Sequence, residues 1–142
     1  MRTGVVGALG ATAVLVLAGC GSSGGYANGA RPPAPINVSV SLTRDAVHVS
    51  PSRVGAGPVI LLVANESDSS RSVTLASPDG GGAGCVVRPA SSGPINPQGT
   101  ARVALQLVEG QCRVGVEGDG LRPALLVVGR RRTSAQDQLF QP

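Results

Sequence analysis

Short runs in which apolar and polar residues alternate are the feature that most limits how this chain can fold. Between Ile36 and Leu42, every second residue is Ile, Val or Leu, and the residues between them are Asn or Ser. Such alternation in β-branched residues predicts a strand with one buried face. From residue 36 to residue 129 no window has a helical period longer than one or two turns. We therefore expect an all-β domain.

The same criteria predict further strands. They fall at residues 46–49, 59–64, 73–75, 85–88, 100–108, 112–116 and 124–128. The run 59–64 is apolar on both faces, which indicates a strand covered on both sides or one that crosses the middle of a sandwich. Seven or eight short strands of this kind predict a two-sheet antiparallel β-sandwich.

Turns and loops are expected between these strands. Residues 50–58, 77–84 and 89–99 are rich in Gly and Pro and are predicted to be loops. The runs 100–108 and 112–116 flank Glu109-Gly110, so we expect them to pair as a β-hairpin.

The beginning of the chain has the layout of an export signal. Arg2 supplies a positive charge, and an apolar run from residue 5 to residue 18 follows it. Leu17-Ala18-Gly19-Cys20 fits the bacterial lipoprotein signal, so residues 1–19 are expected to be removed. Cys20 would then carry diacylglycerol and a further acyl chain such as palmitate. This predicts a lipid-anchored protein on the extracytoplasmic face of the cell membrane. The alternatives are an uncleaved membrane anchor and an ordinary signal with an accidental cysteine.

Composition divides the remaining chain into three parts. Residues 20–35 contain the acylated cysteine and a flexible Gly/Ser/Pro linker, residues 36–129 are the β-sandwich domain, and residues 130–142 are a basic C-terminal tail. In the tail, Ser134 is a candidate cap for one helical turn. Leu139 and Phe140 would then cover the edge of the sandwich or dock on a partner.

Net charge and aromatic content limit the classes of partner. The formal net charge is +4, and every basic residue is Arg. This balance is compatible with an anionic polymer or lipid as a partner, but a solvated basic tail is the simpler interpretation. Nucleic acid is not expected, because the only aromatic residues, Tyr26 and Phe140, lie outside the central domain and no stacking surface exists.

Two cysteines remain once Cys20 is assigned to lipid. In an exported protein, Cys85 and Cys112 are expected to form a disulfide. By the chain-entropy estimate such a bridge is worth roughly 3.5 kcal/mol. The alternatives are a redox-active pair, although no Cys-x-x-Cys spacing is present, and half of a metal site with His48.

Three segments resemble the cupredoxin-like sandwich. They are the central segment 56–67, the Pro-Gly turn segment 94–101 and the segment 107–114 that contains Cys112. The whole chain, including residues 132–140, is similar to actinobacterial cell-envelope lipoproteins of that kind. The resemblance implies a cupredoxin-like or immunoglobulin-like fold, and no chemistry.

A mononuclear copper site of the usual kind is excluded on ligand count. A blue-copper site needs two His, a Cys thiolate and usually an axial Met. The chain contains one His, His48, and one Met, which is the initiator. We therefore expect a sandwich that lacks the copper ligands and has no cofactor.

Taken together, the residues predict a non-enzymatic binding or structural module of the cell envelope. Its partners would be the membrane, through Cys20, and an envelope protein or an anionic polymer. Catalysis with His48 as a base is not expected, because no Gly-x-Ser-x-Gly nucleophile elbow is present. Two alternatives remain: a redox or metal-handling module that uses Cys85, Cys112 and His48, and an accessory subunit of an envelope enzyme.

Overall fold

The computed structural model describes residues 31–78, 84–118 and 120–135. These residues form eight strands and no α-helix, which confirms the predicted all-β sandwich. The strands are β1 (Ile36–Leu42), β2 (Val47–Ser50), β3 (Arg53–Asn65), β4 (Arg71–Ala76), β5 (Ala90–Ile95), β6 (Thr100–Leu107), β7 (Gly110–Val116) and β8 (Ala124–Arg131).

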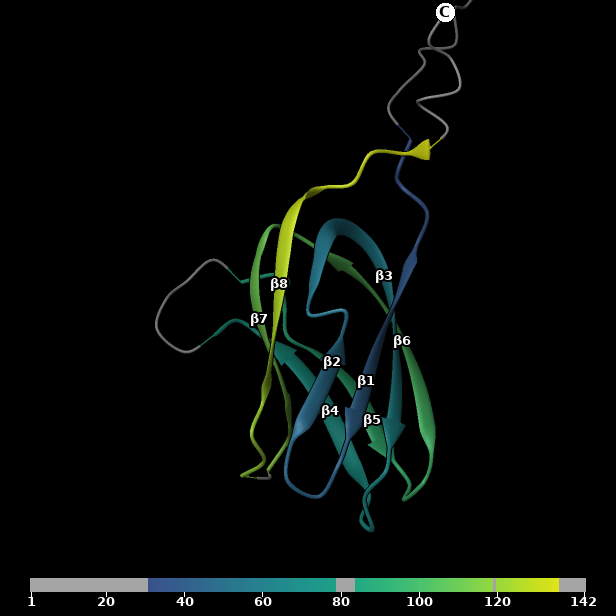
Figure 1. Cartoon of the computed structure of the whole chain (residues 1–142), viewed down its shortest axis with the longest axis vertical. Helices are drawn as coiled ribbons and strands as arrows, with labels where there is room; N and C mark the ends of the chain where they lie inside the picture. Colours follow the sequence, from purple (N-terminus) through teal and green to yellow (C-terminus); the bar gives the residue numbers. More distant parts are fainter. Residues whose placement is uncertain (1–30, 79–83, 119, 136–142) are drawn as a thin grey trace, which may run out of the picture.

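The strands form two layers that share β3 (Figure 1). One layer has the order β2-β1-β3-β6, and the other has the order β3-β8-β7-β4-β5. The pairs β1–β3 and β3–β8 are parallel, and the remaining pairs are antiparallel. Both layers are therefore mixed, whereas a purely antiparallel sandwich was expected.

Strand β3 belongs to both layers because it bends near its beginning. Arg53 to Ala56 pair with β8, while Val59 to Asn65 pair with β1. The register shifts between Gly55 and Ala56, and Gly57 has a φ of 136°. Residues with a side chain rarely adopt this backbone conformation, so glycine permits the bend.

Arg132, which follows β8, fixes this bend and the entry of the chain into β1. Its guanidinium donates hydrogen bonds to the carbonyl oxygens of Gly55, Ala34 and Pro58. A Cβ on Gly55 would lie 2.6 Å from Arg132 Cγ, and a Cβ on Gly57 would lie 3.0 Å from Arg132 Nη2. The two glycines therefore leave the space that the arginine occupies.

The core lies between the two layers and is aliphatic apart from the two cysteines. It is built from the inward-facing residues of the strands and from Cys85, which precedes β5. Its largest fully buried apolar side chains are Leu42, Leu61, Leu75, Leu107, Leu126, Val38, Val40, Val59, Val63, Val73 and Val114.

Two expected loops contain strands instead. The predicted loop 50–58 contains the beginning of β3, which gains its partner only when β8 returns. The predicted loop 89–99 contains β5, which pairs with β4 and carries Pro94. Proline is tolerated there because β5 is an edge strand, where one side of the backbone makes no ladder bonds.

The predicted hairpin of residues 100–108 and 112–116 is wrong. Strand β6 pairs with β3, whereas β7 pairs with β4 and β8. The chain changes layers at Val108 and Glu109, where the amide of Val108 donates to the carbonyl of Cys85. Alternation shows that one face of each strand is buried, and it does not identify the neighbouring strand.

Cys85 and Cys112 join the segment before β5 to strand β7. Their sulfur atoms lie 1.99 Å apart, and the residues are separated by 27 positions. The amide of Cys85 also donates to the carbonyl of Gln111. The disulfide therefore fastens a segment that no long strand holds in place.

Replacing both cysteines, as Cys85→Ala/Cys112→Ala, is expected to lower the free energy of unfolding by about 3.5 kcal/mol, because the unfolded chain regains the entropy that the bridge removes. Urea unfolding followed by far-ultraviolet circular dichroism measures this loss. Reducing agent should destabilise the native protein and leave the variant unchanged. Equal stability of the two proteins would contradict a stabilising bridge.

Candidate functional site

The sequence-predicted site residues that the structure describes do not form a common centre. Cys20 lies outside the described residues. Cys85 and Cys112 are both 0% exposed, whereas His48 is exposed on β2, opposite Ser41 of β1. Within residues 31–78, 84–118 and 120–135, no three side chains of His, Cys, Asp or Glu gather in a way that would hold a metal ion.

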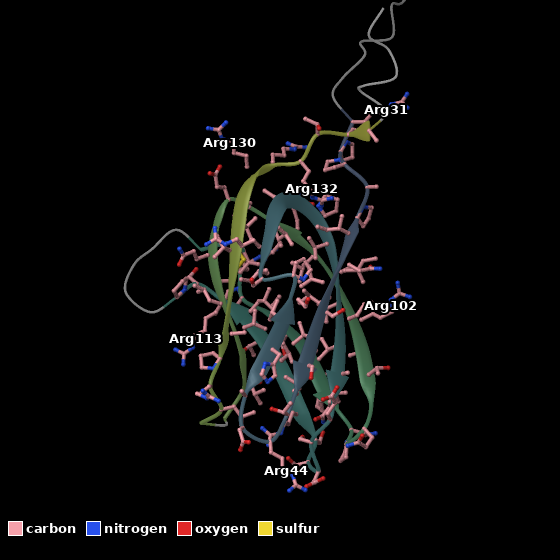
Figure 2. The ribbon with its side chains drawn as sticks, viewed as in Figure 1. Arg31, Arg44, Arg102, Arg113, Arg130 and Arg132 are labelled. Carbon is pink, nitrogen blue, oxygen red and sulfur yellow. A yellow bond between two sulfur atoms is a disulfide. The ribbon has the colours of Figure 1, made fainter. Side chains whose placement is uncertain are left out.

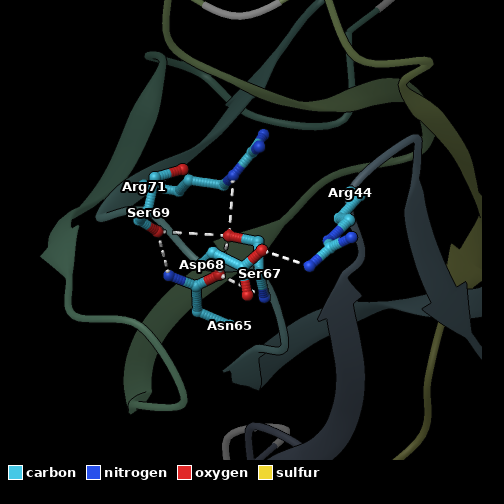
Figure 3. Close-up of polar contacts among 6 residues, drawn as sticks. All are labelled: Arg44, Asn65, Ser67, Asp68, Ser69 and Arg71. Carbon is cyan, nitrogen blue, oxygen red and sulfur yellow. Dashed lines mark hydrogen bonds and ion pairs between the residues drawn. The ribbon is translucent and has the colours of Figure 1, made fainter.

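A buried polar network closes the end of β3 (Figure 3). The side-chain amide of Asn65, which is 1% exposed, donates to the carbonyl oxygens of Ser69 at 2.8 Å and Ile95 at 2.9 Å. Its Oδ1 accepts hydrogen bonds from the amide and the hydroxyl of Ser67, at 3.1 Å and 2.6 Å. Arg71 Nε donates to Ser67 Oγ at 2.8 Å.

This network organises the turn after β3. Its hydrogen bonds link the turn to the end of β5 and the beginning of β4. The neighbouring Arg44 and Asp68 form an exposed ion pair, which adds little stability. Because Asn65 directs both of its polar atoms to groups within the protein, we interpret the network as structural support.

A groove of about 470 Å³ lies on the outer face of β1, β3 and β6. Residues from the three strands meet there in register. Ser39 lies beside Leu62, which lies beside Arg102. The groove is lined by Ser39, Val40, Ser41, Leu62, Val63, Ala64, Glu66, Thr100, Ala101 and Arg102.

The chemistry of the groove suits binding. Leu62 and Ala64 are half-buried and provide an apolar floor, while short hydroxyl side chains from β1 flank it. The exposed Glu66 and Arg102 place charges of opposite sign in the lining. An apolar surface with a few fixed polar groups, in a volume of several hundred Å³, is typical of ligand sites.

Sequence reasoning did not identify the groove, although one signal for it was present. The run 59–64 is apolar on both faces. Its inward-facing residues Val59, Leu61 and Val63 enter the core, whereas the outward-facing Ile60, Leu62 and Ala64 are only half-buried. A strand that is apolar on a face without a covering layer marks an exposed apolar surface.

No protein-family model matches the chain, and no curated protein is significantly similar to it. The groove and the polar network are therefore interpreted from their geometry. In the part of the chain that the structure describes, no helix has the length and apolar character needed to cross a membrane.

The variant Asn65→Ala is expected to lose about 3 kcal/mol of folding free energy, because the carbonyls of Ser69 and Ile95 and the hydroxyl of Ser67 lose a buried partner. Urea unfolding measures the loss. Ser69→Ala is the matched control, since the network uses only its backbone carbonyl, and it should cost less than about 0.5 kcal/mol. Similar losses in both variants would show that the Asn65 side chain is not the centre of the network.

Proposed function

We propose that this protein is a lipid-anchored, extracytoplasmic and non-catalytic binding module of the cell envelope. Its groove on β1, β3 and β6, defined by the lining residues given above, would receive a segment of another envelope protein. The anchor would be Cys20, acylated after removal of residues 1–19. The positive charge, the apolar run and the sequence Leu17-Ala18-Gly19-Cys20 at the beginning of the chain support this assignment.

The groove is the observation that carries this proposal. Strands hold every lining residue except Glu66, which directly follows β3, so most of the groove is fixed before a partner arrives and little ordering entropy is lost on binding. Leu62 offers apolar contact, and Glu66 and Arg102 offer both signs of charge, which a polypeptide segment can match. An accessory subunit of an envelope enzyme would use the same surface.

The redox and metal-handling alternative receives no support from the cysteine geometry. Thiol–disulfide exchange requires access to a sulfur atom. Cys85 and Cys112 are both 0% exposed and lie at disulfide distance from each other, whereas His48 is exposed on β2. We therefore retain the disulfide as a structural element of the binding module.

The anchor is tested by the intact mass of the protein isolated from membranes, with and without reduction and alkylation. We expect the mass of residues 20–142 with acyl groups on Cys20, and two alkylations that appear only after reduction. A Cys20→Ala variant should carry no acyl mass. A native mass that still includes residues 1–19, or that lacks acyl groups, would contradict the lipoprotein assignment.

The groove is tested by site-specific photo-crosslinking in cells. A photoreactive residue in place of Thr100, in the groove, is expected to give a discrete protein adduct. The same residue in place of the exposed Ser91, on β5, should not give that adduct. Gel electrophoresis followed by mass spectrometry of the adduct identifies the partner.

A charge-swapped variant provides the matched control for this experiment. Glu66→Arg/Arg102→Glu keeps the net charge of the protein and exchanges the charges in the groove, so we expect at least a tenfold loss of the Thr100 adduct. Adducts of equal yield from Thr100 and Ser91, or an adduct unaffected by the swap, would contradict binding in the groove.

A further inference from the structure

Charge is unevenly distributed along the long axis of the sandwich (Figure 2). Arg31, Arg130 and Arg132 lie at the end where the linker enters β1 and where β8 ends, and Arg131 belongs to the same segment. We call this end the arginine pole. Among the described carboxylates, only Glu109 lies there, beside Arg131 in a surface pocket.

The other described carboxylates lie at the opposite end. Glu66 follows β3, Glu117 follows β7, Asp45 follows β1, and Asp68 pairs with Arg44. Basic residues also stand at this end: the amide of Arg122 donates to the carbonyl of Asp45, so Arg122 lies beside it. Opposite charges therefore lie close together at this end, whereas the arginine pole combines four arginines with a single described carboxylate.

The arginine pole is also the end from which the chain leads toward Cys20. Ala34 is held against this end by the guanidinium of Arg132. The short stretch between Cys20 and Arg31 can span at most about 40 Å, even when fully extended. If Cys20 is acylated, as proposed above, the bilayer lies on the side of the arginine pole.

We propose that the arginine pole binds the anionic phospholipid surface of the membrane that anchors the protein. This inference rests on the proposed lipid anchor at Cys20. Arg130 and Arg131 are exposed, and guanidinium groups bind phosphate oxygens with two parallel hydrogen bonds. The contact orients the sandwich upright, with its opposite end directed away from the membrane.

Electrostatics favours this contact only at short range. Anionic lipids attract basic residues within about one Debye length, which is roughly 8–10 Å at physiological salt. An acyl anchor raises the local concentration of the arginines at the surface, and a basic cluster provides the second signal that makes membrane attachment stable. High salt should therefore release the pole while the acyl chains keep the protein on the membrane.

The test uses the full protein isolated with its membrane anchor and reconstituted in two kinds of vesicle. One contains only phosphatidylcholine, and the other contains about 30% phosphatidylglycerol, enough to give a negative surface potential. An arginine-specific dicarbonyl reagent, quantified at each residue by mass spectrometry, reports accessibility. Arg130 and Arg131 are expected to react about fivefold more slowly on anionic vesicles and to recover at about 0.5 M NaCl.

Arg102 and Arg122 are internal references, because both are exposed and lie away from the arginine pole. Their reaction rates should be equal on the two kinds of vesicle. In the variant Arg130→Gln/Arg131→Gln, the lipid-dependent protection of Arg31 should disappear. In the matched variant Arg102→Gln/Arg122→Gln, which loses the same charge, that protection should persist.

Several results would overturn the proposal. They are equal reaction rates of Arg130 and Arg131 on both vesicles, equal protection of Arg102 and Arg122, and protection on neutral vesicles by added inorganic phosphate alone. The last result would make a soluble anion, instead of lipid, the ligand. Intact mass of the same reconstituted sample shows whether acyl groups are present, so failure of the anchor assignment is recognised separately.

Discussion

The passage of β3 from one layer of the sandwich to the other is the constraint on which the rest of the structure depends. One strand supplies the partner of β8 in one layer and of β1 and β6 in the other. This arrangement requires a backbone bend that Gly57 permits and a cation that satisfies the exposed carbonyls at the bend. Arg132 meets the second requirement, and its bond to Ala34 also fixes where the chain enters β1. The groove follows from the same strand, because the half of β3 that lies between β1 and β6 has an apolar outer face.

The fold class could be predicted from the sequence because it depends on local information. Alternation identified β1, β6 and most of β7, and the run of apolar residues from 59 to 64 identified the second half of β3. Which strands pair with one another could not be predicted in the same way. Residues 100–108 and 112–116 have the pattern of a hairpin, but their buried faces belong to different layers. The beginning of β3 was expected to be a loop, since its glycines and proline are typical of loops, and only the return of β8 makes it a strand.

The candidate sites also differ in whether local sequence information was enough to predict them. Counting cysteines was enough to expect that Cys85 and Cys112 pair, because the export signal and the two cysteines that remain beside Cys20 are both predicted from local sequence. The support around Asn65 depends on carbonyls of residues 69 and 95, whose approach no local pattern encodes. The groove depends on the registers that place Ser39, Leu62 and Arg102 in one row across three strands. The arginine pole could be identified only from the fold, which places residue 31 and residues 130–132 at the same end of the sandwich.

The parallel pairing of β3 with β8 also determines the order in which this protein can fold. Strand β8 is the last strand of the chain, so the first half of β3 has no parallel partner until residues 124–131 are available. Pairing between segments so distant in sequence is slow, because the intervening chain must first be ordered. In a process that delivers the chain from its N-terminus, seven strands emerge before β8 can close the sandwich. If Cys20 is acylated as proposed above, the final strand would find its place at the membrane surface.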